Sequence, residues 1–269
     1  MQTRYAPSPT GHLHLGHVAN AIYVWGLART AGGRVLLRME DHDRIRCRPE
    51  YEASILEDLA WLGFEPDEGL HPLIRQSDRD HLYRHALEQL RLSHHVYVCD
   101  CSRKRIGAEH YDGFCRTRGL EEGPGRGIRV QIESGADLLL RDRDGNWTYH
   151  FAGVIDDIRQ EITHIIRGED LRSSAERQLR LRQMLGAGAA PVYVHHPLIL
   201  KENGEKLSKS AGDTGVRELR RAGRTASEVI GLAAAAVGLI ESPRSIPATD
   251  VGELFSGFRI PNPESRIPD

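Results

Sequence analysis

The stretch Pro7-Ser8-Pro9-Thr10-Gly11-His12-Leu13-His14-Leu15-Gly16-His17 joins a short apolar segment to a helical pattern. A strand-to-helix junction of this kind presents backbone N–H groups and the positive end of a helix dipole, and both attract anions. His14 and His17 are three residues apart, so they share one face of a first helical turn. Gly16 lets the backbone approach a ligand closely. The stretch therefore predicts a phosphate-binding junction in an α/β fold.

Outward from this junction, helical and strand-like patterns alternate along the chain. Helices are expected at residues 18–29, 50–62, 79–92, 173–185 and 225–239, and strands at 34–39, 128–132, 137–140, 147–155, 162–167 and 192–200. Such alternation indicates βαβ units around a parallel sheet. Ligands bind such sheets at the carboxyl ends of the strands. We therefore expect one ligand site at this edge of the sheet, formed by the junction, Glu40 and the loop after residue 200.

A second stretch, Lys206-Leu207-Ser208-Lys209-Ser210, follows the last expected strand. Its two lysines suit a polyphosphate, because the negative charge of a phosphoryl transition state needs mobile cations beside a preformed cradle. Loops of lysine and serine are also common on solvated surfaces. This stretch therefore indicates chemistry only together with residues 7–17.

Both stretches resemble the HIGH and KMSKS signatures of class I aminoacyl-tRNA synthetases. The string RYAPSPTGHLHLGH resembles the opening of the glutamyl-tRNA synthetase family, and RMEDHD, YHFAGVIDD and IIRGEDL match it in the same order. The resemblance implies a Rossmann-type class I synthetase catalytic core with an inserted zinc-bearing subdomain of the acceptor-binding type and a short C-terminal helical region. It also implies that ATP, accompanied by Mg²⁺, is bound by His14, Gly16, His17 and Lys209, and that the catalytic residues are His14, His17, Lys206 and Lys209.

The same resemblance implies a glutamate pocket. Its expected residues are Arg4, Tyr5, Ala6, Pro7, Ser8, Glu40, Tyr149 and Arg167. Glu40 suits the α-ammonium group, and Arg4 and Arg167 can make forked contacts to a side-chain carboxylate. Two arginines favour glutamate over glutamine, because a neutral amide would leave cationic donors poorly paired.

Two features of this pocket leave alternatives open. Arg167 could instead form a structural ion pair, for which the candidate partners are Asp156, Asp157 and Glu169. Gly153 and Ile158 stand where polar residues, Asn and His, are expected in the longer glutamyl enzymes.

Three of the four cysteines lie between residues 99 and 115, in the pattern Cys99-x-Cys101…Tyr111-x-x-x-Cys115. In a cytosolic protein such a cluster favours a metal over a disulfide. Zinc prefers four ligands in tetrahedral array, so three thiolates leave one position open. The spacing resembles the zinc site of the short glutamyl-type enzymes, which implies one Zn²⁺ held by Cys99, Cys101, Tyr111 and Cys115. The alternative fourth ligands are His94, His95 and His110, and the alternative to a metal is three unpaired cysteines in an inserted loop. Cys47 is expected to be structural.

The part of the chain after Ser210 is short, at 59 residues. We expect it to be too short for the helical anticodon-binding region of full-length glutamyl-tRNA synthetases. A core of this extent with the cysteine–tyrosine pattern resembles the glutamyl-queuosine tRNA(Asp) synthetase family. That resemblance implies transfer of glutamate to the queuosine base at the wobble position of tRNA(Asp). The alternatives are a minimal glutamyl-tRNA synthetase that charges the 3′ end and an inactive tRNA-binding paralogue.

We expect four regions: residues 1–93 and 127–215 as the two halves of the core, 94–126 as the zinc subdomain, and 216–269 as the C-terminal helical region and tail. Charged residues make up 28% of the chain and the net charge is −2, which is typical of a soluble globular protein. No apolar run approaches the ~20 residues that span a bilayer, so we expect a cytoplasmic monomer without membrane contact.

A tRNA partner would need a local basic patch. The candidates are Arg217, Arg220, Arg221 and Arg224. A solvated helix face explains the same four residues equally well.

Overall fold

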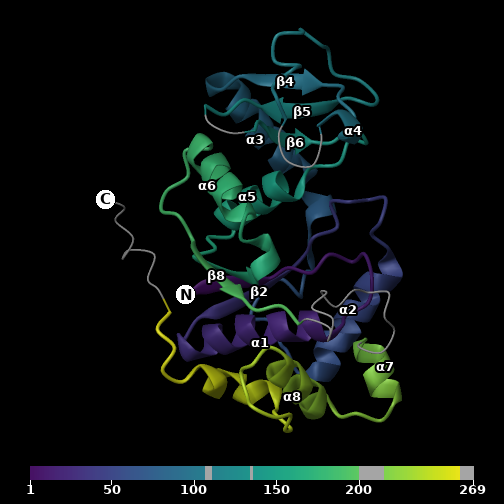
Figure 1. Ribbon diagram of the computed structural model, residues 1–269, viewed down its shortest axis with the longest axis vertical. Coiled ribbons are helices and arrows are strands. Elements are labelled where there is room, and N and C mark those ends of the chain that lie inside the picture. Colours follow the sequence, from purple (N-terminus) through teal and green to yellow (C-terminus); the bar gives the residue numbers. More distant parts are fainter. Residues whose placement is uncertain (107–110, 134–135, 200–214, 261–269) are drawn as a thin grey trace.

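The structure is a computed structural model that describes residues 1–106, 111–133, 136–199 and 215–260 (Figure 1). Its centre is a set of parallel strands. β1 (Gln2–Tyr5), β2 (Arg34–Met39) and β3 (Ile74–Arg75) pair in that order, and β7 (His164–Gly168) pairs with β8 (Val192–His196). The two sheets meet where β1 lies beside β7, because the N–H of Thr163 donates to the carbonyl of Gln2 at 3.0 Å. The Rossmann-type core expected from the sequence is therefore confirmed.

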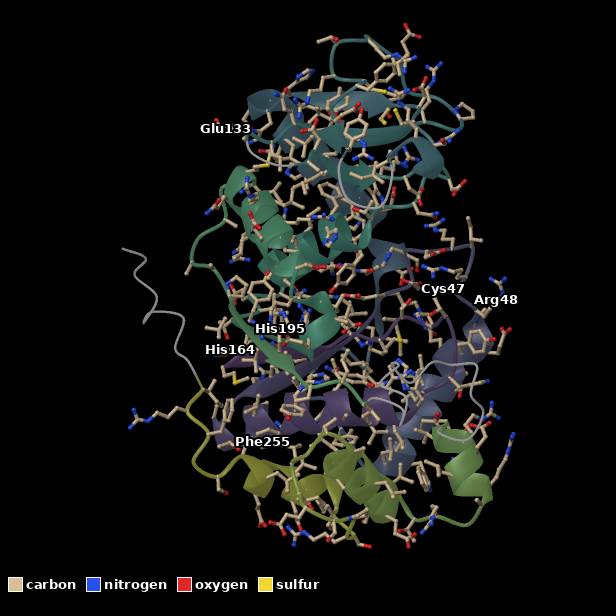
Figure 2. The ribbon with its side chains drawn as sticks, in the orientation of Figure 1. Cys47, Arg48, Glu133, His164, His195 and Phe255 are labelled. Atoms are coloured by element: carbon tan, nitrogen blue, oxygen red, sulfur yellow. The ribbon has the colours of Figure 1, made fainter. Side chains whose placement is uncertain are left out.

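Helices cover this centre. They are α1 (Leu15–Thr30), α2 (Pro49–Leu62), α3 (Asp80–Ser93), α4 (Arg103–Ile106), α5 (Tyr149–Arg159), α6 (Ser174–Met184), α7 (Val216–Arg221) and α8 (Ala226–Ala236), with 3-10 helices at Gln76–Arg79, Glu169–Leu171 and Ala248–Phe255. α1 is buried on nearly all sides, as its continuous apolar sequence requires. It lies between the sheet and α8, and the ring of Phe255 packs against Gly26, where a Cβ would come within 2.2 Å (Figures 1 and 2).

A second, smaller sheet lies at the opposite end of the molecule from α8 (Figure 1). β4 (Val96–Cys99), β5 (Gly127–Val130) and β6 (Leu138–Arg141) are antiparallel in that order. β4 belongs to the expected insertion at 94–126, whereas β5 and β6 follow it, so the sheet crosses that boundary. The division of the chain into four regions stays a prediction.

One sequence prediction of secondary structure is wrong. The strand expected at 147–155 is α5, whose first turn is capped where the Thr148 hydroxyl accepts the N–H of Phe151 at 3.4 Å. The run Phe151–Ile155 is apolar without a break, and such a run fits a buried helix as well as a buried strand. Two smaller differences are a strand that ends at His196 instead of residue 200 and the 3-10 helix Ala248–Phe255, which lies beyond the last helix expected from the sequence. Among the described helices, none is both long and apolar enough to cross a membrane.

Candidate active site

A cavity of about 500 Å³ opens at the carboxyl ends of β1, β2, β7 and β8. The sequence predicts that the functional residues meet at this edge of the sheet. The lining includes eight residues expected from the sequence, namely Arg4, Ala6, His14, Gly16, His17, Glu40, Tyr149 and Arg167. Its volume falls in the range of small-molecule sites.

The two histidines form the N-terminal cap of α1. His14 Nδ1 accepts the N–H of Gly16 at 3.1 Å, and His17 Nδ1 accepts the N–H of His14 at 3.1 Å. A ring nitrogen that accepts a hydrogen bond carries no proton, so the proton of each neutral ring is on Nε2. The ring centroids are 3.9 Å apart. The start of α1 therefore fixes the tautomer of both histidines as well as their position.

The structure gives a reason for glycine at position 16 that the sequence does not reveal. A Cβ at this position would lie 2.9 Å from Cε1 and 3.0 Å from Nδ1 of His14. Contacts this short force one of the groups to move. Glycine is therefore required to seat the His14 ring, whatever ligand approaches from the other side.

Below the cavity lies a buried network of ion pairs. Arg38, which is fully buried, donates to Glu40 Oε1 and to Asp157 Oδ1, both at 2.9 Å. Arg4 Nε donates to the same oxygen of Asp157 at 3.2 Å. Asp156 accepts from Arg79 at 2.6 Å and lies 3.8 Å from Arg38 Nε. Arg4 and Glu40 thus reach the cavity already paired with opposite charges, which lowers the cost of burying them.

Arg167 is different, because it makes no ion pair with any described residue. Its Nη1 donates to Gln178 Oε1 at 2.6 Å and to the Tyr149 hydroxyl at 3.4 Å, and its Nε donates to His195 Nε2 at 3.2 Å. Nη2 is buried and has no hydrogen-bond partner in the described part of the chain. The structural pairing considered from the sequence is therefore absent.

The three acidic residues considered as partners of Arg167 bind elsewhere. Asp156 and Asp157 belong to the network below the cavity, and Glu169 pairs with Arg172.

Burial keeps the groups around Arg167 neutral. It raises the pKa of the Tyr149 hydroxyl, with the negative charge of Glu40 adding to the shift, so this phenol stays a hydrogen-bond donor. Burial and the positive charge of Arg167 lower the pKa of His195, which lies on β8 and is labelled in Figure 2. A neutral His195 can accept from Arg167, whereas a protonated one cannot.

The remaining residues expected in the glutamate pocket lie outside the cavity lining. Tyr5 is buried in the core, where its ring packs against Trp25 and its hydroxyl donates to the carbonyl of His17 at 3.3 Å. The carbonyl of Pro7 accepts the N–H of Glu40 at 3.0 Å, and the Ser8 hydroxyl lies 3.8 Å from Cys47 Sγ. These residues therefore support the cavity wall without lining it. Lys206 and Lys209 lie outside the described residues, so their roles stay predictions.

Several lining residues were not identified from the sequence. They are Ala19, Asn20, Ile166, Gly168, Asp170, Leu171, His196, Pro197, Leu198 and Ile199. His196 ends β8, and Asp170 follows β7, so the rule that ligands bind at the carboxyl ends of strands could have identified both. Asn20, whose amide lies 2.9 Å from His196 Nε2, could not have been found, because it is one of many residues along α1.

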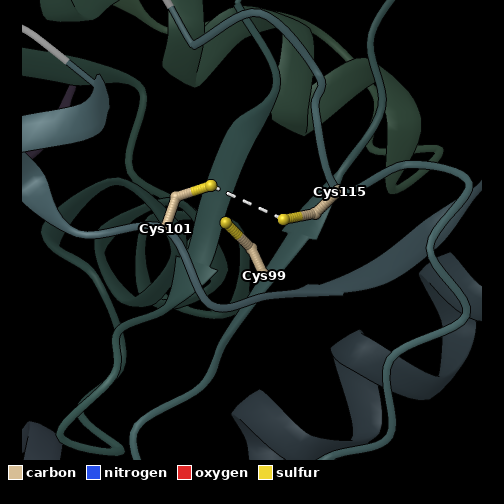
Figure 3. A group of neighbouring side chains, drawn as sticks. All are labelled: Cys99, Cys101 and Cys115. Atoms are coloured by element: carbon tan, nitrogen blue, oxygen red, sulfur yellow. Dashed lines mark hydrogen bonds between the residues drawn. The ribbon is translucent and has the colours of Figure 1, made fainter.

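The three clustered cysteines meet in space (Figure 3). The Sγ atoms of Cys99, Cys101 and Cys115 all lie within 4.8 Å of one another, and all three residues are buried. The Cys101 and Cys115 sulfurs are 3.5 Å apart. Burial and the neighbouring thiols raise the pKa of Cys101 to about 12, whereas hydrogen bonds from Tyr111 and Arg118 lower the pKa of Cys115. A bound cation would favour the thiolate form of Cys101.

The fourth ligand can be judged from the surroundings of this cluster. The Tyr111 hydroxyl is 2.9 Å from the backbone N of Cys115, and Tyr111 packs within the cluster. His94 Nε2 is bound to the carbonyl of Met184, and His95 Nδ1 to Gln131. His110 lies outside the described residues. The three thiols are close enough to hold one metal ion, and Tyr111 as the fourth ligand stays a prediction.

The predicted basic patch is largely neutralised. Arg220 pairs with Glu57 at 2.9 Å, Arg221 lies 3.9 Å from Glu218, and Arg224 lies 3.7 Å from Glu228. Arg217 Nη1 lies 3.4 Å from His12 Nε2. These contacts favour the solvated helix face over a dedicated phosphate site.

Comparison with known proteins gives one consistent result. The family model for "tRNA synthetases class I (E and Q), catalytic domain" matches residues 1–116 and 126–229. A glutamyl-Q tRNA(Asp) synthetase from Nitratidesulfovibrio vulgaris is 38% identical over 297 residues, and the match covers 93% of this chain and 91% of that enzyme. A glutamate–tRNA ligase from Frankia casuarinae is 37% identical over 249 residues, with 83% of this chain and 53% of the ligase covered. This chain therefore spans about half the length of the ligase.

The fold gives the same result. A solved glutamate tRNA ligase from Elizabethkingia meningosepticum, in complex with its amino acid, superposes with a TM-score of 0.74 and 27% identity. The match covers 94% of this chain and 64% of that chain. With the matching family model and the cavity at its signature residues, this chain belongs to the class I tRNA synthetases for glutamate and glutamine.

Proposed function

We propose that this chain activates L-glutamate with ATP to form glutamyl-adenylate and pyrophosphate. The observation that carries the proposal is the cavity, which joins Arg167 to the two histidines that cap α1. An amino acid held through its side-chain carboxylate at Arg167 would lie beside a nucleotide held at the start of the helix. The start of a helix is a favourable place for phosphate.

In this reaction an oxygen of the α-carboxylate of glutamate attacks the α-phosphorus of ATP. The bond between this phosphorus and the bridging oxygen breaks, and pyrophosphate leaves. His14 and His17 carry their protons on Nε2, so they can donate to phosphate oxygens as negative charge grows there. Lys206 and Lys209 are proposed to neutralise the leaving pyrophosphate, with Mg²⁺ entering as the companion of ATP. Glu40 is proposed to bind the α-ammonium group. Arg4 is proposed to form part of the pocket wall, where its hydrogen bond to Asp157 keeps it in place.

We further propose that the acceptor of the activated glutamate is the queuosine base of tRNA(Asp). The support is similarity to relatives that bear the name glutamyl-Q tRNA(Asp) synthetase, at 34% to 39% identity. The second candidate is charging of a tRNA 3′ end, which the similarity to glutamate–tRNA ligases favours. The cysteine cluster is proposed to hold one structural Zn²⁺. We propose that the protein works as a monomer in the cytoplasm, where its ATP and tRNA substrates are found.

Exchange of labelled pyrophosphate into ATP tests the activation step. Exchange should depend on glutamate, proceed without tRNA, and be at least ten times weaker with glutamine, because an amide leaves Arg167 poorly paired. Arg167→Ala should raise the KM for glutamate at least tenfold while the KM for ATP stays unchanged. Arg172→Ala is the matched control, since Arg172 is exposed and pairs with Glu169. Equal use of glutamine and glutamate would refute the proposed substrate.

A further inference from the structure

Gln178 is a buried amide on α6 that touches the cavity only through Arg167. It is 2% exposed, and its Oε1 accepts from Arg167 Nη1 at 2.6 Å, which is the shortest hydrogen bond between that guanidinium and the described residues. We propose that Gln178 is a positioning residue that orients Arg167 through a neutral acceptor, so that the guanidinium charge stays available for a side-chain carboxylate. This inference rests on the proposed activation of glutamate and names a residue that supports the role of Arg167 in its specificity.

The contrast with the neighbouring arginines supports this role. Arg4 shares Asp157 with Arg38, and Arg38 also binds Glu40, so carboxylates compensate both guanidinium groups. The described polar partners of Arg167 are an amide, a phenol and a neutral imidazole. Among these three arginines, Arg167 alone has no carboxylate partner among the described residues, so an incoming carboxylate could pair with it.

Arg167 is also held in a fixed orientation. Gln178 and Tyr149 bind Nη1, His195 binds Nε, and the ring of Tyr193 lies 4.8 Å from the guanidinium carbon. Among the residues that the structure describes, these contacts leave Nη2 as the one nitrogen of this guanidinium without a partner, although it is buried. A buried donor without a partner is costly, and a ligand that binds it removes that cost. Neutral acceptors thus orient the guanidinium without cancelling its charge.

Gly153 on α5 is a neighbour of this amide. A Cβ built on Gly153 would lie 3.9 Å from Gln178 Nε2, which is an ordinary van der Waals contact. Gly153 is also a position where the sequence departs from the polar residue expected of the longer glutamyl enzymes. In this chain the amide beside Arg167 comes from Gln178 on α6, and Gly153 on α5 adds no side chain there.

Pyrophosphate exchange and calorimetric amino-acid binding, measured on the full chain, test this role. Gln178→Glu replaces the neutral acceptor with a carboxylate of the same size, which would pair with Arg167. The KM and the dissociation constant for glutamate should each rise at least tenfold, the preference over glutamine should fall by a similar factor, and the KM for ATP should not change. Gln183→Glu is the control, because it makes the same change at an exposed position of the same helix.

Gln178→Met provides a second variant, since it keeps the length of the side chain but removes the acceptor. Its KM for glutamate should rise while the preference over glutamine persists, because the charge of Arg167 remains. If Gln178→Glu does not fold, an unchanged glutamate KM in Gln178→Met overturns the inference and a raised one supports it. An unchanged glutamate preference in folded Gln178→Glu also overturns it.

Glutamate binding and pyrophosphate exchange, measured on the wild-type protein, test this inference and the proposed function separately. Glutamate binding without exchange would refute the proposed activation, while the binding constants of the variants would still decide the role of Gln178. If the wild-type chain binds no glutamate, both are overturned.

Discussion

At the scale of single residues, the cap of α1 links structure to chemistry. The same two nitrogens that complete the helix cap, Nδ1 of His14 and Nδ1 of His17, determine which nitrogen of each ring can donate. A capping residue that stabilises a helix by about 1 kcal/mol thus also leaves a hydrogen-bond donor on Nε2, which the proposed reaction would use. Gly16 belongs to this arrangement, because any side chain there would displace the His14 ring.

Gly16→Ala should therefore separate activity from stability. We expect pyrophosphate exchange to fall by about 10²-fold, as small misplacements of catalytic groups can cause. The free energy of unfolding should change by less than about 1 kcal/mol, because alanine favours helix more than glycine does. Gly188→Ala is the control, since nothing lies within 4 Å of a Cβ there. Full exchange in Gly16→Ala would contradict the link between the cap and catalysis.

His150 gives a second residue-scale prediction. Burial, with the positive charges of Arg177 and Arg167, lowers its pKa from 6.5 to about 4, and its Nδ1 has no hydrogen-bond partner. The unfolded chain then binds more protons than the folded one between pH 6.5 and about 4. The free energy of unfolding should fall across this window as the pH falls, by roughly 3 kcal/mol from this group.

Urea unfolding at pH 7.5 and pH 4.5 measures this effect. His150→Asn removes the titrating ring, so its free energy of unfolding should depend less on pH than that of the wild-type protein. His85→Asn, at an exposed position of α3, should keep the wild-type dependence. Identical pH dependence in all three proteins would show that His150 is not the group responsible.

The sequence identified residues that face the cavity better than residues that support them. Arg4, Glu40, Tyr149 and Arg167 follow strand ends or match a motif, and the structure brings them to one cavity. The supporting role of Arg38 could not be predicted, because its partner Asp157 is 119 residues away on α5. Roles of this kind depend on packing between distant elements, which no local pattern encodes.

At the scale of elements, the sequence predicted the parallel core more accurately than the small sheet. β2 begins and ends at the predicted residues 34 and 39, because an apolar strand bounded by Gly33 and Glu40 has clear limits. The sheet of β4, β5 and β6 joins strands on both sides of the predicted boundary at 126. Strand pairing over such distances is not visible in local periodicity.

The cysteine cluster at the end of β4 gives a prediction at this scale. Protein purified without chelator should contain one zinc per chain, and Cys101→Ser should lose it and melt at a lower temperature, because the metal would tie residues 99–115 together. Metal analysis and thermal unfolding measure both effects. Cys47→Ser is the control, since Cys47 lies outside the cluster.

The same measurement decides the fourth ligand. Full zinc retention by Tyr111→Phe would point to a histidine or water in place of the phenol. Absence of zinc from the wild-type protein would favour three unpaired cysteines.

At the scale of the whole molecule, the two proposed acceptors of glutamate, a queuosine base and a tRNA 3′ end, lead to different predictions. We expect labelled glutamate to be transferred to tRNA(Asp) that contains queuosine and not to an unmodified transcript. The physical reason is that bases of a single-stranded loop can be unstacked and read in a pocket. Nuclease mapping should place the label in the anticodon loop. Label on the 3′-terminal adenosine of tRNA(Glu) would support the minimal glutamyl-tRNA synthetase instead.

The position of β1 has a consequence for how this molecule is made. β1 precedes every other strand along the chain, yet it lies between β2 and β7, and β7 begins at His164. A ribosome that adds ~5–20 residues per second needs roughly ten to thirty seconds to travel from one to the other. During that time the innermost strand of the sheet keeps one edge without a neighbour, and open strand edges are templates for aggregation. The nascent chain is therefore most in need of chaperone protection before its second half has emerged.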